Sequence, residues 1–131
     1  MDLKSYFETN RGTGVMATAD ADGKVDAAIY SRPHFLDDGT IAFIMRDRLT
    51  HHNLQTNPHA TYLFIENRPG YRGKRLFLTK TREEKGGETL RRLHRRSSRS
   101  EDNQTEADMF LVYFRIDKEL PLIGAGGTTI D

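Results

Sequence analysis

A short polar corner between residues 46 and 57 carries the side chains best suited to binding a ligand. Arg46 and Arg48 follow a strand-like apolar run, and Thr50 stands where a helix is expected to begin. Two guanidinium groups, a hydroxyl and the unpaired N–H groups of a helix N-terminus together suit an anion such as a phosphate. On the local pattern alone, a solvated corner without a ligand is the commoner explanation, so the rest of the chain must decide.

Other chemistries find less support. The chain has no cysteine, which excludes disulfides, thiolate catalysis and cysteine-ligated zinc or iron–sulfur sites. His51 and His52 are adjacent, and on a helix they would point about 100° apart, so we do not expect them to chelate one metal ion. No HxxxH or HxH spacing is present, and we expect no bound metal. No side chain stands out as an essential general acid or base.

A second group of arginines lies between residues 91 and 99. Acidic residues at 83–88 and 101–102 balance it, so a solvated helix face is favoured over a nucleic-acid patch. A role in binding an anionic ligand or a partner subunit stays open for this basic stretch. The charges of the whole chain nearly cancel, with 20 Lys+Arg against 19 Asp+Glu and a formal net charge of +1, and they give no argument for a nucleic-acid partner.

The length of 131 residues fits one domain spanning residues 1–131. An apolar fraction of 36% predicts a thin core, so burial against a partner subunit is expected. No run approaches the ~20 apolar residues of a membrane span, and the first residues lack the apolar core of a signal peptide. We therefore expect a cytoplasmic protein with no membrane partner.

The elements that must position the corner are mostly strands. Asp-Gly pairs at 22–23 and 38–39 each separate two strand-like runs, which is typical of a hairpin because glycine tolerates positive φ. These four strands are expected to form an antiparallel meander. They are residues 15–19, 25–31, 35–36 and 40–45. Further strands are expected at 60–66, 75–81 and 109–116, with a short addition at 120–123.

Short helices are expected at three places. Residues 3–9 place Leu3, Tyr6 and Phe7 on one face; a second helix begins at Thr50 as its N-cap and ends before Pro58. The third spans 83–96, with Leu90 and Leu93 inward. We expect a polar loop at 97–106 and a loose tail after Gly124. Six or seven strands with two or three short helices make a mainly β chain of the α+β kind, and closure into a barrel would remove its exposed edges.

The order of these features resembles the flavin-binding half of the pyridoxamine 5′-phosphate oxidase-like split barrels. The resemblance spans residues 14–82 and depends on Ser31-Arg32-Pro33, Phe43-Ile44-Met45, the corner, and Asn57-Pro58 before a strand. It implies an antiparallel split β-barrel that forms a homodimer and binds FMN in a cleft between the two subunits.

The resemblance also implies which residues hold FMN. The isoalloxazine ring would lie along Ile29, Tyr30, Ser31, Arg32 and Pro33, and the partner subunit would add Arg75. The phosphate arm would lie along Ile44, Met45, Arg46, Arg48, Leu49 and Thr50. The family usually has Ser or Thr and, two residues later, Lys or Arg before the helix, whereas here Arg48 and Thr50 hold these types in the reverse order. Tyr30 and Tyr71 are further candidates for ring neighbours.

The implied function is that of an FMN-dependent oxidoreductase acting on an unidentified small molecule, and the sequence leaves open whether the protein is an enzyme because it offers no essential acid or base. Vitamin B6 oxidation is not expected, because His34 stands where those oxidases have a lysine and the tail offers no substrate-phosphate contacts. Two alternatives stay open: a non-catalytic flavin-binding or sensing module, and a β-barrel binding domain without a cofactor. Heme or a deazaflavin in place of FMN also stays open.

Overall fold

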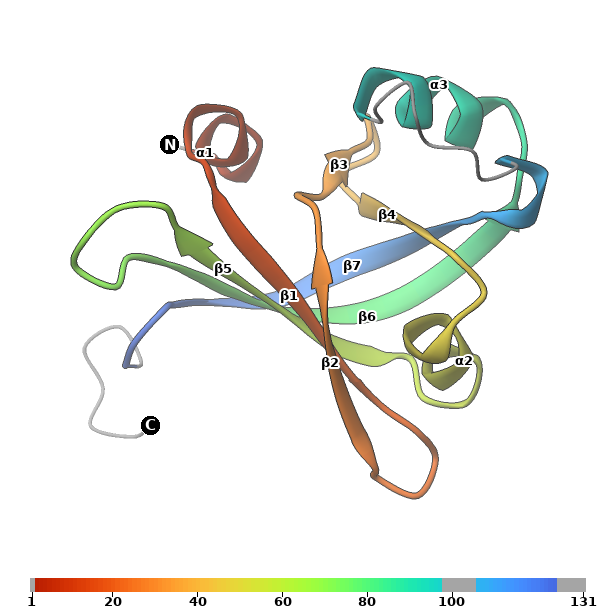
Figure 1. The fold of residues 1–131 in the computed structure, drawn as a ribbon, viewed down its shortest axis with the longest axis horizontal. Coiled ribbons are helices and arrows are strands. Elements are labelled where there is room, and N and C mark those ends of the chain that lie inside the picture. The colour runs from red at the N-terminus through yellow and green to blue at the C-terminus, as the bar shows by residue number, and fades with distance from the viewer. Residues whose placement is uncertain (1, 98–105, 125–131) are drawn as a thin grey trace.

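The computed structural model describes residues 2–97 and 106–124. The elements in chain order are α1 (Leu3–Thr9), β1 (Gly12–Ala19), β2 (Val25–Tyr30), β3 (His34–Phe35), β4 (Ile41–Met45), α2 (Leu49–Thr56), β5 (His59–Glu66), β6 (Gly73–Lys85), α3 (Glu88–Ser97), the 3₁₀ turn η1 (Glu106–Asp108) and β7 (Phe110–Pro121). All seven strands belong to one antiparallel sheet, ordered β2-β1-β5-β6-β7-β4-β3 (Figure 1). The mainly β class with short helices is confirmed.

The inner face of this sheet encloses the main core. Tyr62 of β5 is fully buried there, and its ring centroid lies 5.0 Å from that of Phe43 on β4. The Phe43 ring also meets Tyr30 of β2 edge-on at 6.2 Å. β2, at one end of the sheet, and β4, near the other end, therefore contribute side chains to one core. In Figure 1, β1 and β2 cross over β6 and β7. The sheet curls around aromatic side chains that no single strand could bury alone.

The expected four-stranded meander is wrong, although both of its hairpins exist. β1 pairs with β2 and β3 pairs with β4, and Gly23 and Gly39 in their turns have φ of 81° and 86°. However, β2 and β3 lie at opposite ends of the sheet. Arg32, between them, donates hydrogen bonds of 2.7 and 3.1 Å to the carbonyl oxygens of Phe7 and Asn10 at the end of α1. The chain is thus drawn out of the sheet after β2 and crosses to the far edge.

The second expected helix is present as α2, but its N-cap is Arg48 and not Thr50. Arg48 makes no side-chain capping hydrogen bond. Thr50 lies inside the first turn, where its hydroxyl donates to Asp26 on β2 at 3.4 Å. The hydroxyl that was expected to cap the helix therefore binds Asp26, a residue far from it in the sequence.

Residues 83–85 extend β6 instead of opening the third helix. They pair with the first residues of β7 beyond a register shift between Lys80 and Arg82. Gly86 and Gly87, with φ of 62° and 95°, then end the strand, so that α3 begins at Glu88. Leu90 and Leu93 are buried as expected.

β7 joins the two strands expected at 109–116 and 120–123 into one. Helix α1 has the expected bounds and buries Phe7. Most of the expected polar loop and the tail after Gly124 lie outside the described residues. Among residues 2–97 and 106–124, no helix is long and apolar enough to cross a membrane.

Candidate functional site

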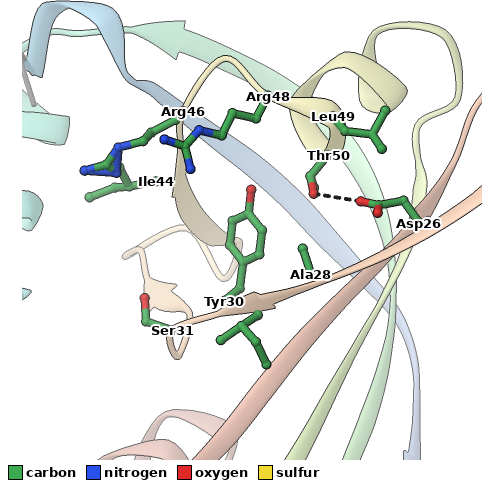
Figure 2. Close-up of a pocket in the computed structure, with 10 residues that line it drawn as sticks. Asp26, Ala28, Tyr30, Ser31, Ile44, Arg46, Arg48, Leu49 and Thr50 are labelled. Atoms are coloured by element: carbon green, nitrogen blue, oxygen red, sulfur yellow. Dashed lines mark hydrogen bonds between the residues drawn. The ribbon is translucent and has the colours of Figure 1, made fainter.

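A cavity of about 430 Å³ lies where β2, the end of β4 and the start of α2 meet (Figure 2). We call it the β2–α2 cavity. It is lined by Asp26, Ala28, Ile29, Tyr30, Ser31, Ile44, Arg46, Arg48, Leu49 and Thr50. Its charged lining residues are one carboxylate and two guanidinium groups, so the lining carries a net positive charge. The volume lies within the range of small-molecule sites in proteins, about 300–1,000 Å³.

Most of the residues expected to bind FMN line this cavity. They are Ile29, Tyr30, Ser31, Ile44, Arg46, Arg48, Leu49 and Thr50. Of the other four expected residues, three belong to the same part of the chain and lie outside the cavity. Arg32 binds the end of α1, Pro33 is buried, and Met45 is a core residue with 1% of its surface exposed. Arg32 and Pro33 lie outside the cavity because they belong to the crossover after β2. Met45 lies outside it because the end of β4 turns this side chain into the core.

Arg75 also lies outside the β2–α2 cavity of its own chain. Its guanidinium donates to the carbonyl oxygens of Pro121, at 2.9 Å, and Gly124. This residue was expected to reach the ring from a partner subunit. The position of Arg75 within a single chain therefore does not test whether it reaches the ring in the partner subunit.

The end of β2 is held from inside the core. The Tyr62 hydroxyl donates to the carbonyl oxygen of Ser31 at 3.0 Å, just beyond the last residue of the strand. Tyr30 is half-buried, with its ring against Phe43 and its hydroxyl directed toward Arg48 and Thr50 in Figure 2. Burial raises the pKa of the Tyr30 hydroxyl, which therefore stays protonated and able to donate a hydrogen bond at neutral pH.

The start of α2 is held from behind by β6 and β7. Nε2 of His51 lies 3.0 Å from Oε2 of Glu83, and its ring stacks on Phe110. Lys80 donates to Glu83 at 2.7 Å and Gln55 donates to it at 3.0 Å. Partial burial acts to raise the pKa of Glu83, but the hydrogen bonds from Lys80, Gln55 and His51 outweigh it and lower this pKa to about 2. An ionised Glu83 thus fixes the helix that carries Thr50.

Two lining residues, Asp26 and Ala28, were not expected from the sequence. Alternation along a strand places them on the same side of β2 as Tyr30, so the position of Tyr30 could have indicated both. What the sequence does not show is that this side of β2 faces α2, because that contact joins residues far apart in the chain. The complete arrangement offers guanidinium groups and a helix N-terminus to an anion, and hydroxyl and carboxylate oxygens to its neighbouring hydroxyl groups.

Comparison with known proteins gives one family. The family model described as pyridoxamine 5′-phosphate oxidase matches residues 4–117. No curated protein matches the chain significantly.

Solved structures share the fold at low sequence identity. An FMN-binding protein from Syntrophomonas wolfei is 23% identical with a TM-score of 0.70, over 91% of this chain and 82% of that chain. HutZ, the heme storage protein from Vibrio cholerae, is 18% identical with a TM-score of 0.68, over 88% of each chain. An FAD-binding protein from Mesorhizobium loti is 15% identical with a TM-score of 0.59, over 91% of this chain and 92% of that chain. These similarities establish the split-barrel fold.

Proposed function

Because this chain belongs to the pyridoxamine 5′-phosphate oxidase family, we propose that the β2–α2 cavity binds FMN and that the protein is an FMN-dependent oxidoreductase acting on a small molecule. The observation that carries this proposal is the meeting of Arg46, Arg48 and Thr50 with the end of β2 around one cavity. Family membership supports flavin binding, and the cavity supplies groups that suit each part of FMN.

The phosphate of FMN would bind at the start of α2. Arg46 and Arg48 provide guanidinium groups, which form strong charge-assisted hydrogen bonds with phosphate oxygens. Thr50 adds a hydroxyl within the first helical turn, where the helix dipole favours negative charge. The reverse order of arginine and threonine relative to the family pattern therefore still leaves both chemical types beside the same cavity.

The ring of FMN would lie along the end of β2. Ile29, Ile44 and Leu49 give this part of the cavity apolar surface, while the backbone after Tyr30 is fixed by Tyr62. Bound FMN supplies the redox chemistry. The contribution of the chain is to orient the ring, to exclude water from one of its sides and to place a protonated Tyr30 hydroxyl near the cofactor.

We infer that the functional unit is a homodimer, because one side of the sheet is largely apolar and no described residue of the chain covers its exposed part. The apolar residues of this outer sheet face are Val15, Ala17, Val25, Ala27, Ile29, Leu63, Ile65 and Phe77, and strand register places Thr61 and Arg75 among them. Val25 is 84% exposed and Ile29 is 73% exposed. The barrel interior buries only the inner face of the sheet. The commonest way to bury the outer sheet face is against a second copy of the chain related by a two-fold axis.

The outer sheet face is continuous with the β2–α2 cavity, because Ile29 belongs to both. A partner that covers this face would therefore also wall the open side of the cavity. Arg75 pairs with Leu63 across β5 and β6, which places it on the outer sheet face, the surface from which it would reach a partner's flavin. The proposed dimer thus accounts for an arginine that is remote from the cavity of its own chain.

The test begins with the absorption spectrum of the purified protein. Bands near ~450 and ~370 nm indicate bound flavin, whereas a Soret band would indicate heme and would contradict the FMN proposal. Apo-protein is then titrated with FMN, FAD and riboflavin. We expect FMN to bind more tightly than FAD because the corner suits a terminal phosphate. A colourless protein without affinity for any flavin would refute the proposal.

Reduction of the bound flavin separates the enzyme from a passive flavin-binding module. Rapid bleaching of the flavin bands by NADH or NADPH, followed by reoxidation with an added acceptor, is expected of the oxidoreductase. Tight flavin binding without reduction by either nucleotide would support the module instead.

A further inference from the structure

The β2–α2 cavity contains a negative charge at the place where an anion is expected. Oδ2 of Asp26 accepts the hydrogen bond of the Thr50 hydroxyl at 3.4 Å (Figure 2). Thr50 is the second residue of α2, a helix whose first turn carries no acidic residue and whose N-cap, Arg48, makes no side-chain capping bond. A carboxylate from β2 therefore supplies the negative charge that the start of this helix favours.

This carboxylate and the two arginines line the same cavity, and Thr50 lies between Asp26 and Arg48 in Figure 2. Asp26 faces Thr50 on α2 and Thr18 across the ladder on β1, and neither of these carries a charge. Among the lining residues, Asp26 is the only acid. A phosphate bound to Arg46, Arg48 and Thr50 would lie beside it.

We propose that Asp26 is a specificity-determining residue, whose carboxylate competes with the phosphate of the ligand for the Thr50 hydroxyl and repels that phosphate. This inference rests on the proposed FMN site. Like charges a few ångströms apart repel even at the effective dielectric constant of a protein surface. Asp26 thus weakens binding of a phosphate-bearing ligand relative to the same ligand without its phosphate.

The test compares FMN with riboflavin in Asp26→Asn, which keeps the size of the side chain and one acceptor oxygen but removes the charge. We expect FMN affinity to rise about 5- to 20-fold and riboflavin affinity to change less than about two-fold, the scale of one screened charge pair. The gain should shrink at ~0.5 M salt, where screening shortens the range of the charge. Asp22→Asn, which removes an exposed carboxylate in the β1–β2 turn outside the cavity lining, should leave both affinities unchanged.

A second variant guards against a folding defect. Asp26→Ser removes the same charge with a smaller side chain, and we expect an increase in FMN affinity of the same sign. An unchanged or weakened FMN affinity in both variants, with thermal unfolding like that of the natural protein, would overturn the role of Asp26.

A failure of the proposed FMN site can be distinguished from a failure of the role of Asp26. If neither the natural protein nor Asp26→Asn binds FMN or riboflavin, the proposed function is wrong. Calorimetric titration with inorganic phosphate then decides the inference: tighter binding by Asp26→Asn supports the competition, and equal binding overturns it.

Discussion

The imidazole ring of His51 stacks on the ring of Phe110, with centroids 3.8 Å apart and planes 22° from parallel. The contact joins the first turn of α2 to the first residue of β7, and Glu83 of β6 adds a hydrogen bond from the other side. The helix that presents Thr50 to the β2–α2 cavity therefore depends on two strands that follow it in the chain. The position of Thr50 at the cavity is therefore set by this distant support.

The first prediction concerns this support. Replacing Glu83 by Gln should lower the free energy of unfolding at pH 7 by about 1–2 kcal/mol, a figure reduced for solvent screening because the side chain is 22% exposed. The pKa of Glu83 is lowered from 4.5 to about 2, so its contribution is present above pH 4.5 and is lost as the pH falls toward 2. Denaturant unfolding at several pH values measures the difference between the two proteins.

The control for this prediction is Glu88→Gln, because Glu88 is 89% exposed and forms an ion pair with Arg91 one turn along α3. We expect no comparable pH-dependent difference for it. A stability difference between the natural protein and Glu83→Gln that stays constant from pH 7 to pH 2 would show that Glu83 does not act through its charge.

The second prediction concerns the phosphate. Arg48→Ala and Thr50→Ala should each weaken FMN binding by about 1–3 kcal/mol, the scale of one charge-assisted hydrogen bond, and should leave riboflavin binding largely unchanged. Fluorescence titration with the two flavins measures this difference. Arg92→Ala, at an exposed position on α3, is the matched control. An equal loss for riboflavin would mean that the corner does not hold the phosphate.

The local features of this fold could be predicted from the sequence, and the pairings between distant segments could not. The hairpins at Asp22-Gly23 and Asp38-Gly39 are set locally, because both glycines have positive φ and the Asp20 and Asp38 carboxylates accept backbone N–H hydrogen bonds within the turns. The separation of β2 from β3 depends on Arg32 binding carbonyl oxygens of α1, for which no local pattern exists. The same distinction applies to the candidate site. Arg48 and Thr50 could be predicted because they stand at the start of a helix that the sequence pattern indicates. Asp26 could not be predicted, because it lines the cavity only where β2 packs against α2.

The point at which β6 ends and α3 begins could not be predicted from the periodicity of the sequence. Residues 83–85 are compatible with a helix, but in the fold Glu83 finds Lys80, Gln55 and His51 around it and stays in the sheet. Tertiary partners outweigh local preference here. The helix can begin only after Gly86 and Gly87 have turned the chain.

The third prediction concerns the dimer. Light scattering of the flavin-loaded protein should give about twice the 15.0 kDa of one chain, and dilution should release flavin because binding and association are linked. Val25→Lys places a charge on the outer sheet face and should shift the protein toward monomer and weaken FMN binding. Ala107→Lys, at an exposed position on η1, is the control. A monomer at micromolar concentration that retains stoichiometric FMN would refute the dimer and the shared site.

The fourth prediction concerns the close approach of β1 to the core. A Cβ atom on Gly14 would overlap the Tyr62 hydroxyl and lie 2.5 Å from the carbonyl oxygen of Tyr30. Gly14→Ala should therefore destabilise the fold by about 2–4 kcal/mol, as overpacking of a rigid site does, and should displace the hydroxyl that fixes Ser31. Thermal unfolding and FMN titration measure the two effects. Gly23 has φ of 81° and open space around it, so Gly23→Asn is a milder comparison. A Gly14→Ala protein as stable as the natural one would show that Tyr62 can move freely.

The position of β7 in the sheet determines when the β2–α2 cavity can form during synthesis. β7 lies between β6 and β4, and in the described sheet the other neighbour of β4 is the two-residue β3. While a ribosome is still making residues 110–121, β4 has no long strand to pair with, and Phe110 is not yet there to stack on His51. The N-terminal hairpin and the β5–β6 hairpin can form early from local contacts. The cavity wall made by β4 and α2 must therefore wait for β7, so the β2–α2 cavity can form only after residues 110–121 have been made.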